Sequence, residues 1–384
     1  MITKVPVVVV GGSANALGVL RSLTHCDLTL LCDSLDAPAW SSRYGRKILV
    51  ANTRAATVVK DLVQLATECT WAHRPVLVLT EEKTVVHVSA ARTQLQSLYE
   101  FLLCPEPLLS DLQSKAGFQD RASSAGSPVP RGVVLEGEGS LPRIQALQYP
   151  CVLKPLEQDP IYAQHFKKAY KVSSAADVVA LYRDIEPIMP RMIVQEWLEG
   201  EDSDIYFCLG FYDNDSQLVG ETFTGRKVRS WPLQVGGTAS CTSAPEAAAE
   251  LTRLTSDFVR ATGFVGQIGM EFKKDRLRGA FYMIEPTVGR TDYQHEIATL
   301  SGCNVLTMMV AYLSRQPVPG CGSYREVIWY DEIADANALE HGARNSLFLD
   351  RTRVSAVWRV SDPLPTITDL WRRIKNRLRR LLGG

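Results

Sequence analysis

Residues 269–290 read GMEFKKDRLRGAFYMIEPTVGR, and this stretch decides how the rest of the sequence is interpreted. Two short apolar-flanked runs surround a polar patch that contains the turn residues Asp275 and Gly279. This pattern predicts a β-hairpin. Glu271 and Glu285 then lie equally far from the turn and face each other on neighbouring strands. Because like charges directly opposite each other destabilise a sheet, the pattern favours a cation between the two carboxylates.

That cation is predicted to be a hard divalent ion. Mg²⁺ binds one or two carboxylates and completes its shell with water and phosphate oxygens. Glu285 directly follows the apolar run AFYMI and is itself followed by a loop that carries Arg290, and a buried carboxylate needs a partner. The hairpin residues alone also fit two solvated glutamates on an exposed face; the rest of the chain favours the metal.

The composition describes a chain with ample core and no dominant charge. Its 384 residues suffice for two or three domains. The 42 basic and 42 acidic side chains balance, so no overall field favours nucleic acid as a partner. The first residues contain too short an apolar run for a signal peptide, and no segment approaches the length of a membrane span. We therefore expect a soluble, cytoplasmic protein.

The cysteines and histidines form no recognisable framework. Nine cysteines are scattered without a CxxC pair, which suits a reducing compartment better than disulfides. The six histidines lack the spacing of a zinc site. Neither residue type predicts a transition-metal centre.

The N-terminal segment predicts a Rossmann-like unit. A β-branched strand at 5–10, a glycine-containing turn, a helix at 19–24 and a strand at 28–32 that ends at Asp33 form a βαβ pattern. The glycines do not fit GxGxxG, so binding of NAD or FAD is the weaker alternative to a domain that packs on another and helps to shape its pocket. A strand at 75–79 and a helix at 91–103 complete this domain near residue 105.

Two lysines follow, and only the second lies in a sequence context that indicates a function. Lys115 lies in a helical segment, where a basic residue is usually solvated. Lys154 ends the apolar strand of PCVLKP. A buried ammonium needs an anion, which indicates a phosphate-binding lysine; the alternative is a lysine at the strand edge that reaches water.

An acidic cluster and a basic cluster follow. A helix at 177–186 and a strand at 192–198 lead to the acids of residues 199–204, which are explained by turn chemistry or by carboxylates that bind a ribose. After a strand at 205–211, a turn at 213–215 leads to a strand at 218–222. The basic trio Arg226, Lys227 and Arg229 then suits a polyphosphate or a carboxylate substrate, and a helix at 245–262 leads back to the Glu271/Glu285 hairpin.

In this order and at these distances, the segments SKAGF, GSPVP, PCVLKP, VQEWLEGEDSD, TGRKVR, GMEFKKD and IEPTVGR resemble the ATP-grasp superfamily, and within it the carboxylate–amine ligases. The match covers about residues 5–315. The resemblance implies an α/β fold, α+β in its grasp part, with a Rossmann-like pre-grasp domain before a two-lobed ATP-grasp domain.

The resemblance also implies site residues. The phosphates of ATP would contact Lys115 and Lys154, and the adenine would be read by a hinge. Mg²⁺, or Mn²⁺ in its place, would bridge the phosphates, and basic side chains would act on them and on the reacting carboxylate. The hinge residues would be Gln195, Glu196 and Leu198; the ribose would bind Glu201 or Asp204; the metal ligands would be Glu271, Glu285 and Thr287; and the catalytic cations would be Lys227, Arg229 and Arg290.

Two positions depart from the family pattern. Thr287 stands where the family usually has an asparagine, and the segment expected to cover the phosphates, 157–168, contains no glycine. The resemblance therefore implies an ATP-dependent ligase that joins a carboxylate to an amine through an acyl phosphate, with an amino acid or peptide as the default substrate. A degenerate, nucleotide-binding regulatory or scaffold protein is the alternative.

The C-terminus carries a different signal. Past residue 320 the resemblance fades into an extension, 321–362, and two prolines set off the sequence TDLWRRIKNRLRRLL at 368–382. Six cations surround an apolar face with Trp371, which fits a helix lying on anionic lipid. The alternative is a helix that docks on its own domain or on a partner protein. The predicted organisation is therefore 1–105, 106–320, 321–362 and a basic helix at 363–384.

Overall fold

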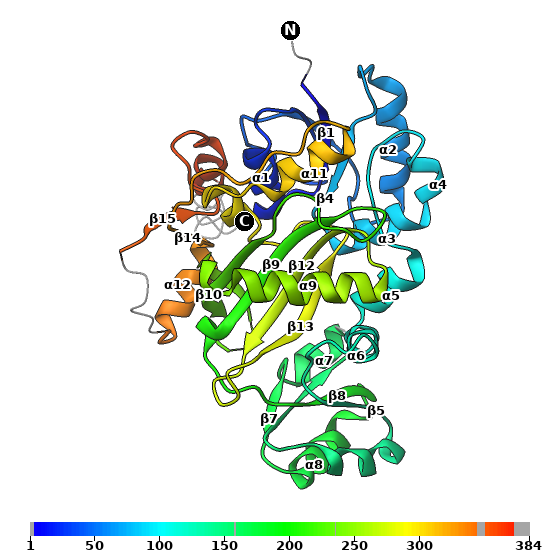
Figure 1. Ribbon diagram of the computed structural model, residues 1–384, viewed down its shortest axis with the longest axis vertical. Helices are drawn as coiled ribbons and strands as arrows, with labels where there is room; N and C mark the ends of the chain where they lie inside the picture. The colour runs from blue at the N-terminus through cyan, green and yellow to red at the C-terminus, as the bar shows by residue number, and fades with distance from the viewer. Residues whose placement is uncertain (1–3, 157–158, 235, 344–349, 372–384) are drawn as a thin grey trace, which may run out of the picture.

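Three β-sheets organise the chain in a computed structural model, which describes residues 4–156, 159–234, 236–343 and 350–371. A seven-stranded sheet lies at the centre, with the N-terminal sheet towards one end of the molecule and a small four-stranded sheet at the other (Figure 1). This mixture of parallel and antiparallel sheets confirms the predicted fold class. The predicted domain limits remain an interpretation of the sequence.

The N-terminal sheet is parallel and has the strand order β3-β2-β1-β4. The valines of β1 are buried on both faces, as expected for a strand covered by helices on each side. Its strands are β1 (Pro6–Val10), β2 (Asp27–Cys32), β3 (Arg46–Leu49) and β4 (Val76–Leu79), and its helices are α1 (Ala14–Ser22), α2 (Thr57–Glu68), α3 (Glu82–Ala90) and α4 (Arg92–Leu95).

The helix predicted at 91–103 is wrong. Helix α4 ends at Leu95, and the chain then runs in an irregular path that makes two isolated β-bridges, Glu100 with Val76 and Leu103 with Gly266. These bridges attach the segment to the N-terminal sheet and to the central sheet. Tertiary pairing therefore overrides the local helical pattern here.

The small sheet is antiparallel, with the order β5-β8-β6-β7. Alternate residues of its central strands face a separate apolar core that includes Leu153, Val178 and Tyr182. The elements of this lobe, with the two helices that precede it, are α5 (Glu106–Gln113), α6 (Lys115–Ser124), β5 (Gly132–Glu136), η1 (Glu138–Ala146), β6 (Cys151–Pro155), α7 (Pro160–His165), β7 (Tyr170–Val172), α8 (Ala175–Ile185) and β8 (Arg191–Glu196).

The central sheet has the order β13-β12-β9-β10-β11-β14-β15, so the predicted C-terminal extension adds two strands to it. Helix α9 lies across this sheet (Figure 1) and ends at Gly263, whose left-handed φ of 66° suits a glycine. The elements are η2 (Asp202–Asp204), β9 (Ile205–Tyr212), β10 (Phe223–Trp231), β11 (Gly237–Ser243), η3 (Pro245–Ala247), α9 (Ala248–Thr262), β12 (Gly266–Lys274), β13 (Phe281–Val288), α10 (Glu296–Leu300), α11 (Val305–Leu313), β14 (Val327–Tyr330), α12 (Glu332–Glu340) and β15 (Thr352–Ser355).

The strand predicted at 218–222 is also wrong. Only one bridge forms there, between Tyr212 and Leu218, and β10 begins at Phe223. The carboxylate of Asp213 accepts hydrogen bonds from the backbone N–H groups of Asp215 and Gln217 (2.9 and 2.8 Å), so the turn itself is present. Gly220, with φ of 70°, then interrupts the extended conformation.

The expectation that the cysteines remain reduced fails for one pair. Cys303 and Cys321, 18 residues apart, form a disulfide between the α10–α11 loop and the segment before β14. The other seven are free thiols, most of them buried in the described part of the chain. Within the described residues, no helix is both long and apolar enough to cross a membrane.

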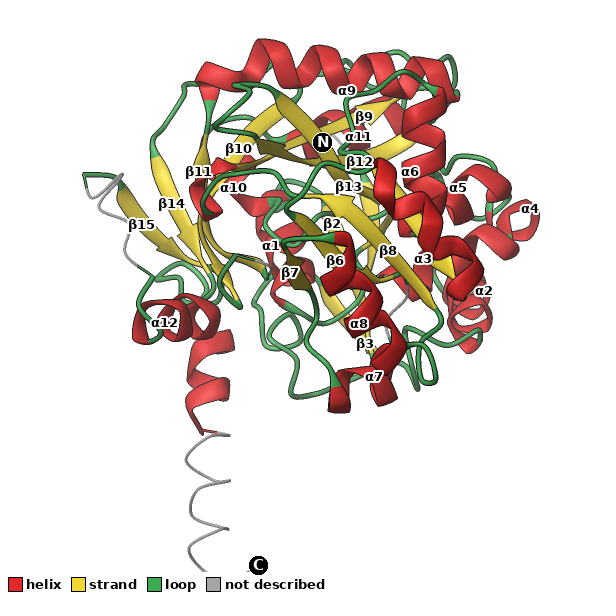
Figure 2. Cartoon of the chain, turned by 90° about the horizontal axis from the view of Figure 1, so that it is seen from below, coloured by secondary structure: helices red, strands yellow, loops and turns green. Residues whose placement is uncertain are grey.

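The last described helix comprises residues 364–371 and leads away from the body of the molecule in the direction of the C-terminus (Figure 2). Most of the predicted basic helix, residues 372–384, lies outside the described residues, so only its first turns are placed. Its orientation is set by the segment that precedes it.

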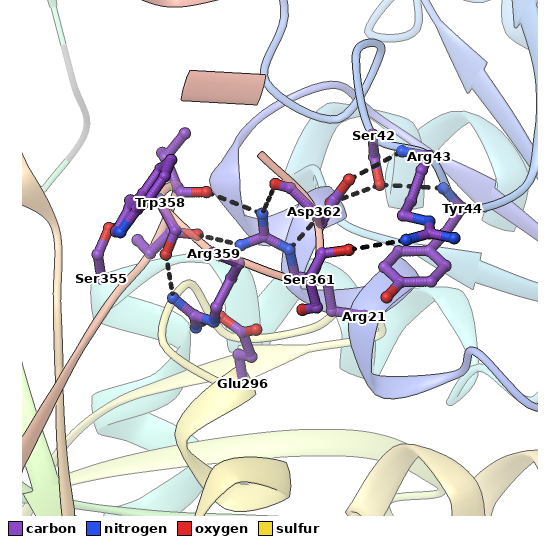
Figure 3. Close-up of polar contacts among 12 residues, drawn as sticks. Arg21, Ser42, Arg43, Tyr44, Glu296, Ser355, Trp358, Arg359, Ser361 and Asp362 are labelled. Carbon is purple, nitrogen blue, oxygen red and sulfur yellow. Dashed lines mark hydrogen bonds and ion pairs between the residues drawn. The ribbon is translucent and has the colours of Figure 1, made fainter. Parts of the chain in front are cut away.

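That segment is fastened to the N-terminal domain by a buried polar cluster (Figure 3). Asp362, fully buried, accepts hydrogen bonds from Arg21 (3.2 Å), from the hydroxyl of Ser42 (2.8 Å) and from the backbone N–H of Arg43 (2.9 Å). Arg21 also donates to three backbone carbonyls of the segment, and Arg359 pairs with Glu296 at 2.9 Å. The C-terminal segment is therefore part of the folded core.

Candidate active site

The predicted hairpin is formed by β12 and β13, and its register is the one that the sequence implies. Glu271 and Glu285 are direct partners across the two strands. A β-bulge follows, so that Ile284 has no partner on β12, and bulges of this kind often redirect side chains near functional sites. The two glutamates are therefore directly opposed, as predicted, but Glu285 is exposed, so the expectation that its carboxylate is buried is wrong.

A buried lysine lies against this pair. Lys227, from β10, is 3% exposed, and its Nζ lies 2.8 Å from Oε2 of Glu271. Burial raises the pKa of the Glu271 carboxyl, and Glu285 adds to this effect, whereas Lys227 opposes it. The two carboxylates therefore hold negative charge close together, with Lys227 in direct contact and Lys154 near Glu285, and the raised pKa of Glu271 shows that its charged form remains disfavoured, which is the setting for a further cation.

These residues line a cavity of about 1250 Å³ that is bounded by the small sheet, the central sheet and the loops that follow their strands. Its size is sufficient for a nucleotide and a second small molecule. The cavity contains most of the side chains that the sequence predicted for the site: Lys115, Lys154, Gln195, Glu196, Leu198, Lys227, Glu271, Glu285, Thr287 and Arg290.

Lys154, at the end of β6, contributes its ammonium to the cavity. Burial lowers the pKa of Lys154 to about 8, although the nearby Glu285 partly opposes this change. Lys115, at the start of α6, donates to the carbonyls of Pro155 and Leu156 at 3.1 and 3.3 Å. Both cations therefore lie where β6 meets the cavity, and an anionic ligand would restore the charge balance that burial disturbs.

The residues predicted to form the hinge lie at the end of β8 and just after it, on the cavity wall. Gln195 donates to the side chain of Gln119 at 2.8 Å, and Glu196 accepts the backbone N–H of Gln148 at 3.0 Å. These bonds hold both side chains between the elements of the small lobe. Leu198, which is buried, closes the same side of the cavity.

The segment predicted to cover the phosphates lacks glycine because part of it is helical. Residues 157 and 158 lie outside the described residues. Asp159 then caps α7 by accepting the backbone N–H of Tyr162 at 2.8 Å, with Pro160 in the first turn. Tyr162 and Phe166 face the cavity. A helical cover does not need the conformational freedom that glycine would give.

The acidic cluster at 199–204 does not line the cavity. Asp204 accepts the backbone N–H of Glu201 at 2.8 Å in a capping box and pairs with Arg276 at 2.6 Å, while Glu201 is largely exposed beside the same arginine. Asp202 accepts the backbone N–H groups of Ser230 and Gln234. These bonds correspond to the turn-chemistry alternative, and the ribose role predicted for Glu201 or Asp204 has no support in the geometry.

Arg229 also lies apart from the cavity. Its guanidinium forms a buried, bidentate pair with Asp335 of α12, at 2.6 and 2.9 Å. Arg290, in contrast, lines the cavity at the end of β13; it donates to the carbonyl of Thr291 at 3.2 Å and lies 3.8 Å from Glu82. Of the predicted catalytic cations, only Lys227 and Arg290 are therefore brought to the cavity.

Asp292 is a cavity residue that the sequence interpretation missed. It lies two residues after Arg290, and a Cβ added to Gly269 would come within 2.8 Å of its Oδ2, so β12 passes directly beside this carboxylate. Burial raises the pKa of Asp292, Glu285 adds to the shift, and Arg290 opposes it. The signal available was a carboxylate and a cation together in the loop after a buried strand.

The N-terminal domain holds this loop in place. The amide of Asn15 donates to the carbonyls of Thr80 and Thr291 at 3.1 Å each, and the hydroxyl of Thr291 donates back to it at 2.7 Å. The backbone N–H of Thr291 also bonds to the carbonyl of Leu79 at 3.0 Å. The domain that lacks a dinucleotide motif therefore positions Arg290 and Asp292 and adds Lys83 to the cavity wall.

The donor set suits magnesium better than a transition metal. In the described parts of the chain no group of three or more His, Cys, Asp and Glu side chains is arranged to hold an ion. Two carboxylates and the Thr287 hydroxyl would leave half of an octahedral coordination shell to water and phosphate oxygens, which is the usual situation for Mg²⁺ beside a nucleotide.

No protein-family profile and no curated protein matches the sequence. Solved structures do match the fold. An N5-carboxyaminoimidazole synthetase from Staphylococcus aureus superposes with a TM-score of 0.65 over 89% of this chain and 86% of its own, at 15% identity. A carboxyaminoimidazole ribonucleotide synthase from Aspergillus clavatus superposes with a TM-score of 0.58 over 84% of this chain and 81% of its own, at 15% identity.

The biotin carboxylase domain of the Hydrogenobacter thermophilus 2-oxoglutarate carboxylase is similar as well, with a TM-score of 0.60 over 83% of this chain and 72% of its own, at 13% identity. The chain has the ATP-grasp fold. At these identities the likeness concerns architecture alone.

Proposed function

We propose that this protein is an ATP- and Mg²⁺-dependent ligase that joins a carboxylate to an amine through an acyl phosphate. The observation that carries the proposal is the cluster of Lys227, Glu271 and Glu285 at the metal end of the cavity, with Lys154 across from it. Opposed carboxylates beside lysines are what a metal–triphosphate needs, because the cations neutralise charge that the phosphates carry.

The proposed nucleotide site uses residues of both lobes. Lys115 and Lys154 hold phosphates, and the backbone and side chains of Gln195, Glu196 and Leu198 surround the base. Glu271, Glu285 and the hydroxyl of Thr287 are the proposed ligands of Mg²⁺, which when bound neutralises charge on the phosphate oxygens. The similar H. thermophilus domain was solved with ADP, magnesium and bicarbonate, which supports the same ligand class here.

The chemistry follows from the poor electrophilicity of a carboxylate. A carboxylate oxygen attacks the γ-phosphorus, the bond to the β–γ bridging oxygen breaks, and ADP leaves. The amine then attacks the acyl carbon, and inorganic phosphate leaves as the amide forms. Arg290 is proposed to hold the carboxylate and Lys227 to stabilise charge on the transferring group, and positioning of this kind provides most of the catalysis in phosphoryl transfer.

The amine must lose a proton in this sequence, and we assign the acceptor role to Asp292. The carboxylate lines the cavity in the loop that carries Arg290, close to the predicted acyl site. Burial raises its pKa, which makes it a stronger base than an exposed aspartate. Asp292 would then deliver the free amine for attack on the acyl phosphate.

The proposed substrate class is a small carboxylate and a small amine, with an amino acid or short peptide as the default. The cavity lining carries both signs of charge, with the cations Lys83 and Arg290 and the acids Asp292 and Asp331. A zwitterion fits such a pattern. The choice of an amino acid or peptide rests on analogy of fold.

The test is ADP release from Mg-ATP in the presence of pooled carboxylates, with hydroxylamine as a generic amine. We expect ADP and a hydroxamate that appear only when the correct carboxylate is present, because hydroxylamine traps acyl phosphates. Tight Mg-ATP binding without ADP release from any pool would refute the ligase and leave the alternative, a nucleotide-binding protein in which Thr287 does not support turnover.

A further inference from the structure

The short helix at residues 364–371 is amphipathic, but its apolar face points to the solvent and its other face packs on the protein. Leu364, Ile367, Leu370 and Trp371 occupy one face and are 48%, 43%, 57% and 69% exposed. The opposite face, with the buried Pro365, packs towards the protein. A surface helix ordinarily turns its apolar side chains to the core. This helix presents them outward, where the described part of the chain leaves them uncovered.

The concentration of such residues is unusual for the molecule. Trp358 and Val360, just before the helix, are 47% and 84% exposed, so six large apolar side chains are exposed between residues 358 and 371. Elsewhere the exposed large apolar residues are scattered, and scattered ones require no explanation. A contiguous group of this kind marks a surface that binds something.

The anchor of the segment fixes this orientation. Asp362 is buried against Arg21 and Ser42 immediately before the helix (Figure 3), and the hydroxyl of Thr368 donates to that of Ser41 at 2.9 Å. The polar bonds are thus made on the inner side, and the helix points away from the body (Figure 2). The exposed apolar face is a consequence of this attachment.

The sequence after residue 371 indicates what this apolar face binds. Residues 372–384 read RRIKNRLRRLLGG, with six cations and no acid. Apolar side chains and a tryptophan followed by dense positive charge match a surface that is apolar below and anionic above, which is the interface of a bilayer with acidic headgroups. A protein partner or a second copy of this chain would not by itself call for six cations without an acid.

We propose that residues 358–371 dock the protein on anionic lipid, with the side chains of Leu364, Ile367, Leu370 and Trp371 inserted, and that the cations in the sequence after residue 371 add attraction to the headgroups. This inference is independent of the proposed ligase activity. It concerns peripheral binding, since the described helices include none that could span a bilayer.

The first test is flotation of the full-length protein with vesicles of phosphatidylcholine alone or mixed with phosphatidylglycerol. We expect binding to the mixed vesicles only, weakened by salt because headgroup attraction is screened. The double variant Leu370→Ser/Trp371→Ser is expected to lose at least about tenfold in affinity. The matched control Leu277→Ser removes an apolar side chain that is 81% exposed on the β12–β13 turn and should bind as the wild type does.

A second pair of double variants tests the contribution of charge separately from that of the inserted apolar side chains. Arg379→Gln/Arg380→Gln is expected to weaken binding by about 25-fold, at roughly fivefold for each cation near an anionic surface. Arg253→Gln/Arg260→Gln, on the exposed face of α9, removes the same charge elsewhere and should have no effect. Equal binding to neutral vesicles, no binding to either kind, or self-association that Leu370→Ser/Trp371→Ser abolishes without lipid would each overturn the proposal.

Discussion

Two groups of carboxylates in this protein look alike in sequence and are used in opposite ways. The acids of residues 199–204 are bound by the backbone and by the side chains of Lys171 and Arg276, so that they cap a turn, accept N–H groups and form ion pairs. Glu271 and Glu285, on paired strands, have one lysine between two charges and a cavity beside them. An acid becomes available for chemistry when its surroundings leave its charge incompletely satisfied. The variants below test that difference.

The largest effect is expected at the opposed pair. Glu285→Gln keeps the size of the side chain and removes one negative charge, so the proposed metal loses a ligand and turnover should fall by at least about 10²–10³-fold. ADP release under saturating Mg-ATP measures it. Glu250→Gln, on α9 and away from the cavity, is the matched control. ADP release by Glu285→Gln at close to the wild-type rate would sink the metal assignment.

Asp292 extends the comparison to a third cavity acid. Asp292→Asn should lower the rate with an ordinary amine by about 10²-fold, since general base catalysis contributes on that scale. The loss should be much smaller with hydroxylamine, which is mostly unprotonated at neutral pH and needs no base to become nucleophilic. An equal loss with both nucleophiles would mean that Asp292 supports the loop structure only.

The charge of Lys154 provides a test of the cations that face the carboxylates across the cavity. Because burial lowers the pKa of Lys154 to about 8, the ammonium that holds phosphate is present below pH 8 and is lost above it. Affinity for ATP should therefore fall as pH rises past 8, approaching about tenfold per pH unit. Lys154→Arg stays charged throughout this range and should flatten the profile. Titrations by calorimetry between about pH 6.5 and 9.5, a range that brackets the lowered pKa and lies below the ordinary lysine value of about 10.4, would show it.

The smallest effects on activity are expected in the acidic cluster. Asp204→Asn weakens the capping box and the pair with Arg276, so it should lower the free energy of unfolding by about 1–2 kcal/mol and leave ATP affinity within about twofold. Glu201→Gln, at an exposed side chain, should change stability by less than about 0.5 kcal/mol. Denaturant melts with parallel ATP titrations compare the two. A large loss of ATP affinity in Asp204→Asn would restore the ribose role.

The sequence predicted the parts of the site that depend on strand geometry. Glu271 and Glu285 could be paired because their spacing from the turn is symmetric, and Lys154 stood out because a charge ended an apolar strand. The acids near residue 201 could not be assigned, since the same residue types cap turns and bind ligands, and the partner that decides between these roles, Arg276, lies more than 70 positions away.

Other errors have the same origin in tertiary contact. Asp292 lies in a loop that Asn15 holds by a hydrogen bond to Thr291, 276 positions away in the sequence. No local sequence pattern could predict this contact. The helix predicted at 91–103 gave way to bridges with two different sheets. Helical periodicity placed an apolar face on the last helix, yet which way that face turns was fixed by Asp362 and its partners.

The attachment of Asp362 to Arg21 also limits how this protein can be divided. These residues lie 341 positions apart and share one buried ion pair, so the two ends of the chain belong to one cooperative unit. A fragment that begins at residue 106 would leave the carboxylate of Asp362 without its arginine, and one that stops at residue 320 would remove two strands from the central sheet. Neither fragment is an autonomous module, although the sequence suggests a boundary at both places.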